Sequence, residues 1–136
     1  MSTAIPALRA AIQARLSTDT DLTGLIGAGR IHDEAPRAMQ GVYVVHGEVE
    51  ARDWSTGTES GCEQEVALTV WAGESASSRL ALEAAGRIMV ALDQAALALI
   101  GHRLINLRWR SSRLSRDART GFAFVTLRFR AVTETL

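Results

Sequence analysis

The side chains that most often carry out chemistry in proteins are few and widely spaced in this chain of 136 residues. The three histidines are His32, His46 and His102, and none has another His, Cys or Glu at a metal-ligand spacing. Cys62 is the only cysteine, and its strand-like surroundings favour a small packing residue over a nucleophile. The sequence therefore predicts no catalytic residue, no metal site and no cofactor.

Two other patterns resemble functional motifs but lack the rest of the motif. Glu63 and Glu65 are carboxylates at strand spacing, and a general acid–base pair would also need a concave pocket. Gly27 and Gly29 lack the third glycine and the preceding strand of a dinucleotide site. The patterns argue against an enzyme. A small ferredoxin-like enzyme or ligand-binding module stays open as an alternative, because such folds host many unrelated functions.

Hydrophobic periodicity predicts six main elements in a single domain that spans residues 1–136. They are a helix over about 5–16, strands over 42–49 and 62–71, a helix over 77–95, and strands over 104–110 and 122–132. A short helical turn and a short extended piece are expected between the first helix and the first strand. The order α-β-β-α-β-β predicts an α+β fold, in which two hairpins form a four-stranded antiparallel sheet and two helices pack on one face. Polar loops are predicted at 53–61 and 111–121.

Charge is distributed unevenly along the chain, although its formal net value is zero. Residues 33–74 contain nine acids and two bases, for a net charge of −7, whereas residues 101–136 contain eight arginines and two acids, for a net charge of +6. A net charge of zero argues against a dedicated nucleic-acid binder. The polarity instead predicts head-to-tail pairing of copies, which forms a ring when the rotation between copies closes.

The period-two alternation of the strands divides their side chains between two faces of the sheet. The apolar positions predicted to face the helices are Val66, Leu68, Val70, Ile105, Leu107, Trp109, Val125, Leu127 and Phe129. The opposite face, which we call the outer face, is predicted to carry Glu63, Glu65, Asn106, Arg108, Arg110, Phe122, Phe124, Arg128 and Arg130.

Arginine and aromatic side chains are enriched in protein interfaces, and both types occur on the predicted outer face. The alternative is an ordinary solvated face with surface ion pairs of ~0–1 kcal/mol each. The predicted subunit or partner interface consists of Glu63, Glu65, Arg108, Arg110, Phe122, Phe124, Arg128 and Arg130, together with Trp54 of the 53–61 loop.

The N-terminal residues lack the basic flank and the apolar run of a secretory signal. The longest apolar run, residues 95–100, is too short to span a bilayer. The sequence therefore predicts a cytoplasmic location during assembly and no membrane partner.

Several blocks of the sequence, in this order, resemble a known family. They are the residues 7–12 and 22–27, Arg30-Ile31-His32-Asp33-Glu34-Ala35-Pro36, Val42-Tyr43-Val44-Val45, Val66 to Ala72 with the alanine-rich helix after it, and Leu127 to Glu134. Together they resemble the phage tail-completion, or tail-terminator-like, proteins of tailed phages, prophages and gene transfer agents.

The resemblance implies a structural protein that forms a ring, typically a hexamer, at the neck of a virion or phage-like particle. Such a ring caps the finished tail tube, stops its polymerisation and joins it to the head-side connector protein. The implied partners are further copies of the chain, the tail tube protein and the connector, while DNA passes through without being specifically bound. A head–tail connector subunit, either a stopper or an adaptor, is the alternative. The resemblance supplies no catalytic residues.

Overall fold

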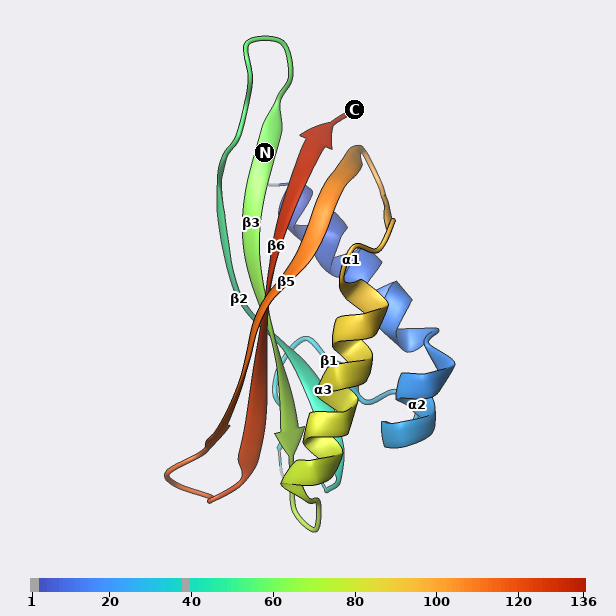
Figure 1. The fold of residues 1–136 in the computed structure, drawn as a ribbon, viewed down its shortest axis with the longest axis vertical. Helices are drawn as coiled ribbons and strands as arrows, with labels where there is room; N and C mark the ends of the chain where they lie inside the picture. The colour runs from blue at the N-terminus through green and yellow to red at the C-terminus, as the bar shows by residue number, and fades with distance from the viewer. Residues whose placement is uncertain (1–2, 38–39) are drawn as a thin grey trace.

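Within residues 3–37 and 40–136, which the computed structural model describes, the chain forms three helices and one six-stranded sheet. The elements are α1 (Ala4–Ser17), α2 (Thr20–Ile26), β1 (Ile31–His32), β2 (Val42–Asp53), β3 (Gly61–Ala72), α3 (Ser78–Leu92), β4 (Ala98–Leu99), β5 (His102–Arg116) and β6 (Ala123–Thr135). The strand order is β1-β2-β3-β6-β5-β4. All three helices cover the same face of the twisted sheet, so the outer face has no helical layer (Figure 1).

The prediction of a four-stranded antiparallel sheet covered by two helices is wrong. The six predicted elements are present in the predicted order, but the sheet also contains β1 and β4, and a third helix, α2, is formed. The sheet is mixed because β1 pairs parallel with β2. Each additional strand has only two residues, too few for the alternation of side chains that identifies a strand in a sequence.

The predicted helix over 77–95 is α3, which ends at Leu92 and buries several alanines against the sheet. Ser77 caps its first turn by accepting a hydrogen bond from the Leu80 N–H at 3.2 Å. The small side chains let the helix approach the sheet closely. The buried residues of α3 are Ala81, Ala84, Ala85, Ile88, Ala91 and Leu92.

The core lies between the helices and the two central strands, β3 and β6. Their antiparallel register places Val66 opposite Phe129, Leu68 opposite Leu127, and Val70 opposite Val125. All six side chains are buried, which confirms their predicted place on the helix-covered face.

Strand β5 departs from its predicted length and alternation. The predicted loop over 111–121 is wrong in its first part, because β5 continues to Arg116 and pairs with β6 along its whole length. Two β-bulges, at Leu104/Asn106 and Trp109/Ser111, shift its alternation. Ile105 falls in the first bulge and is 46% exposed. Trp109 keeps its place opposite Phe129 but is 40% exposed, although the sequence predicted it beneath the helices.

The two long hairpins carry their loops at opposite ends of the molecule. Figure 1 shows the loop between β2 and β3 at one end and the turn between β5 and β6 at the other. The first loop belongs to the acidic part of the chain, and the second belongs to the arginine-rich part. None of the described helices has both the length and the apolar character needed to cross a membrane.

Candidate protein interface

The outer face brings together charged side chains from four neighbouring strands. The register places Glu65 of β3 beside Arg130 of β6, and Arg130 beside Arg108 of β5. Arg128 lies on the same face, opposite Ala67 of β3. The structure therefore juxtaposes residues of different strands, with Glu65 and Arg130 lying 65 positions apart in the chain. Whether a partner covers them is not tested by the fold, and the interface stays a prediction.

Glu63 lies at the centre of an ion-pair cluster on this face. Its side chain is 9% exposed and accepts a hydrogen bond from Arg52 at 2.8 Å and another from the Arg130 Nε. Because both arginines stabilise the charged carboxylate, the pKa of Glu63 lies below its usual value. A carboxylate held in its charged form does not supply a proton near neutral pH, so Glu63 is a poor general acid.

Arg52, which the sequence analysis did not single out, connects three carboxylates on β2 and β3. Besides Glu63, it donates to Glu50 at 3.0 Å and to Glu65 at 3.2 Å. These contacts raise the pKa of Arg52 above its ordinary value, with the bond to Glu63 as the largest cause. The two strands of the acidic hairpin are thereby joined by side chains as well as by their backbone.

Replacing Glu63 with glutamine should lower the Tm at pH 7 by several degrees, because Arg52 and Arg130 then lose their shared anionic partner. The pKa of Glu63 is depressed in the folded chain, so its stabilisation is complete above its unfolded pKa of about 4.3 and is lost as the pH falls through the folded pKa. The gap in Tm between wild type and variant should therefore shrink as the pH is lowered from about 5 through the folded pKa.

Circular dichroism melts over that pH range measure the gap. Glu59→Gln, in the exposed hairpin turn, is the matched control and should change the Tm little at any pH. A gap between wild type and Glu63→Gln that stays the same in acid would show that the carboxylate charge does not stabilise the fold.

Trp54 lies next to the same cluster. The guanidinium carbon of Arg130 lies 5.2 Å from the centre of the Trp54 ring, within the range of a cation–π contact. Trp54 is half exposed. Arg130 is therefore engaged by two groups of its own chain, Glu63 and Trp54, and is less available to a partner than the sequence implied.

Three of the predicted interface arginines, Arg108, Arg110 and Arg128, are exposed and make no ion pair within 4.0 Å among the residues that the structure describes. Their charges differ in this respect from that of Arg130. Unpaired arginines on adjacent strands repel one another, so these three are the positions at which an anionic partner would stabilise the outer face most.

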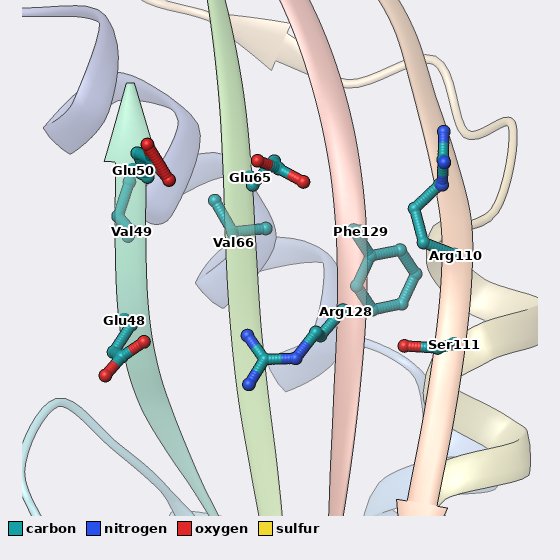
Figure 2. Close-up of a pocket in the computed structure, with 9 residues that line it drawn as sticks. All are labelled: Glu48, Val49, Glu50, Glu65, Val66, Arg110, Ser111, Arg128 and Phe129. Atoms are coloured by element: carbon teal, nitrogen blue, oxygen red, sulfur yellow. The ribbon is translucent and has the colours of Figure 1, made fainter. Parts of the chain in front are cut away.

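A groove of about 540 Å³ separates the acidic and basic parts of the outer face. Figure 2 shows that the acidic residues Glu48, Glu50 and Glu65 come from β2 and β3, that Arg128 and Arg110 come from β6 and β5, and that the Arg128 side chain reaches from β6 toward β3. The charges thus change sign across the width of the sheet. The remaining lining residues are Val49, Val66, Ser111 and Phe129.

The predicted aromatic residues are only partly available at the surface. The Phe124 ring packs on Trp71 with ring centres 4.6 Å apart, and both residues are half-buried. Phe122 is also half-buried, at the turn before β6. The contribution of Trp71 was not predicted, because it depends on the register that places Trp71 opposite Phe124.

His46 and His102 link the sheet to the N-terminal helical segment, and Cys62 is buried in β3. The His46 Nε2 lies 2.8 Å from the Gln13 Oε1, and the His102 Nε2 lies 3.0 Å from the Thr3 Oγ1. Burial lowers the pKa of His46 and raises that of the buried Cys62 thiol. These side chains act in packing between layers.

The family model described as "Tail completion protein gp17" matches residues 10–134. The chain belongs to this family. It is also similar to a chain of a solved structure, "Virion of native gene transfer agent (GTA) particle", with a TM-score of 0.86 and 29% sequence identity over 96% of each chain. Comparison with curated proteins gave no match.

The gp17 family assignment confirms the predicted resemblance to tail-completion proteins. It supports a structural role in a phage-type tail rather than catalysis. A role in assembly also fits the arrangement of the outer face, where exposed charges of opposite sign lie side by side and the buried carboxylate is held ionised.

Proposed function

We propose that this gp17-family chain is a tail terminator, which assembles into a ring on the finished tail tube, stops its growth and joins it to the head-side connector. The family match and the likeness to a chain of a gene transfer agent virion support a tail component. The observation that carries the proposal is the outer face, where the exposed Arg110 and Arg128 line the same groove as the exposed Glu48, Glu50 and Glu65.

This charge arrangement favours contacts between copies of the chain. The acidic residues lie on the β2 and β3 side of the sheet, and the unpaired arginines lie on the β5 and β6 side. A second copy related by rotation presents its acidic side to the basic side of the first. Such a heterologous contact repeats from copy to copy and closes into a ring. Six copies is the number that the resemblance implies.

Two further partners complete the proposed site of action at the neck of the particle. The tail tube protein meets one end of the ring, and the head-side connector protein meets the other. DNA passes through the opening without specific contacts, since the chain as a whole has no net charge to attract it. Assembly takes place in the cytoplasm, before the protein becomes part of the particle.

Deletion of the gene, followed by electron microscopy of the particles, tests the proposal. A tail terminator predicts tails of uncontrolled length and heads that are not joined to tails. Tails of normal length that stay separate from heads would instead identify a head–tail connector. Particles of normal appearance would contradict both roles. Expression of the wild-type chain from a second locus should restore normal particles and is the control.

A further inference from the structure

Both edges of the sheet are only partly covered. Strand β1 pairs with β2 at Val44 and Val45, and β4 pairs with β5 at His102 and Arg103. Among the described residues, the rest of β2 beyond its bulge and the rest of β5 have no neighbouring strand on that side. An uncovered edge strand presents backbone N–H and C=O groups that pair readily with another chain.

The first half of the β5 edge is already occupied by its own chain. The Gln94 N–H donates to the Leu107 carbonyl at 2.7 Å, and the Trp109 N–H donates to the Asp93 carboxylate at 2.8 Å. The free part of this edge therefore begins after the bulge at Trp109/Ser111.

Strand alternation determines which residues point out of this free part. The Asp117 N–H donates to the Phe122 carbonyl at 2.8 Å, so Asp117 faces β6. Every second residue of an antiparallel strand faces the same neighbour. The backbone N–H and C=O groups of Ser112, Leu114 and Arg116 consequently point away from β6, toward the open edge.

The same reasoning applies to β2. The Trp54 N–H donates to the Gly61 carbonyl at 3.0 Å, so Trp54 faces β3. By alternation from Trp54, the backbone N–H and C=O groups of Val49, Ala51 and Asp53 point away from β3. These residues lie between the bulge at His46/Val49 and the loop that joins β2 to β3. Each edge thus offers three residues whose backbone groups are free to pair.

The two free edges carry opposite charge. Glu48, Glu50 and Asp53 lie along the β2 edge. Arg110, Arg113 and Arg116 lie along the β5 edge. Two β5 edges would bring like charges together, and so would two β2 edges. The occupant that fits each edge is therefore the other edge of a second copy.

We propose, on the basis of the function proposed above, that residues 112–114 of one copy pair antiparallel with residues 49–51 of the next, so that the sheet continues from subunit to subunit. Strands β2, β3, β6 and β5 alternate in direction. A β2 strand added beside β5 therefore continues the alternation when neighbouring copies are related by rotation alone.

Charge and backbone geometry select the register. With Leu114 opposite Val49, Arg113 lies opposite Glu50 on the outer face. A shift of two residues in one direction places Arg113 opposite Arg52, which is a repulsive pair. A shift in the other direction places Leu114 at Gly47, which lies in the bulge and whose carbonyl accepts a hydrogen bond from Arg9.

This register also gives the offset along the strands that a sheet needs in order to close into a barrel. Val49 is level with Val66 and Phe129, whereas Leu114 is level with Val125, four residues further along β6. The offset is ~13 Å along the strands, over a repeat of four strands that is ~19 Å wide. The ratio corresponds to a strand tilt of about 35°, which lies in the range found in closed barrels.

A cysteine pair tests the contact in assembled particles. A chain with Glu50→Cys and Arg113→Cys, in a Cys62→Ala background, should form covalent multimers on oxidation, because the two positions face each other across the subunit boundary. Reductant should return the multimers to single chains on a gel. The matched control carries Glu50→Cys and Arg79→Cys, since Arg79 is exposed on α3 and far from either edge.

Charge exchange is the second test. Arg113→Glu and Glu50→Arg alone should each weaken association by roughly fivefold at every contact, and the two together should restore it. Failure of rescue, with multimers no more abundant than in the control, would overturn the proposed contact. If gene deletion still gives overlong tails, the terminator function survives that failure; particles of normal appearance on deletion would refute the function itself.

Discussion

Replacing Phe129 with alanine should lower the free energy of unfolding by about 3–5 kcal/mol. Phe129 is 1% exposed and lies on the central strand β6, opposite Val66 and Trp109. Removing the ring leaves a cavity between the sheet and the helices that close-packed neighbours cannot fill. Urea unfolding followed by circular dichroism measures the change.

The matched control is Leu82→Ala, a truncation on the exposed side of α3, which should cost less than about 1 kcal/mol. Similar losses for Phe129→Ala and Leu82→Ala would contradict the central position of Phe129 in the core.

The double substitution Arg110→Glu with Arg128→Glu should prevent assembly while the chain still folds. Both side chains are exposed, make no ion pair within the described part of the chain, and line the groove opposite Glu48, Glu50 and Glu65. Reversal of their charge places acids on both sides of the groove. Association should fall by more than about tenfold, because like charges brought together at an interface cost several kcal/mol.

Native mass spectrometry at low and high salt measures association, and thermal melts measure folding. Arg79→Glu is the control, since its side chain is 88% exposed on α3, away from the outer face. Arg130 is unsuitable for this test because it pairs with Glu63 inside its own chain. Equal losses in melting and in association, or unchanged association, would contradict the assignment of the outer face to assembly.

The sequence predicted the long elements of the fold well, because each has enough turns or alternations to show its period. The central pairing of β3 with β6 follows from the apolar alternation around Leu68 and Leu127. Strand β4 was missed, and β1 was expected only as a short extended piece, because two residues show no period. The end of β5 was read as a loop because Ser112 and Arg113 are polar, and its backbone is held by pairing with β6 rather than by its own composition.

The arrangement of side chains on the outer face was predicted only in part, and their role as an interface stays a prediction. Alternation placed Glu63 and Arg130 on the same face, and the structure joins them. It did not indicate Arg52 as the second partner of Glu63, because that pairing depends on the hairpin register after the bulge in β2. For the same reason, the sequence did not indicate that Arg130 forms an ion pair with Glu63 whereas Arg128 forms none among the described residues.

The change of charge sign across the sheet has a consequence for how free copies meet. Opposite charges at the two sides of a chain with no net charge make the subunit an electric dipole lying across its strands. Two such dipoles approaching in solution turn each other, so encounters begin with the negative flank of one facing the positive flank of the other. Dissolved salt screens this electrostatic interaction, with a screening length of about 8 Å at physiological ionic strength. We therefore expect the rate at which copies associate to fall as ionic strength rises, whereas the proposed strand pairing depends on the backbone.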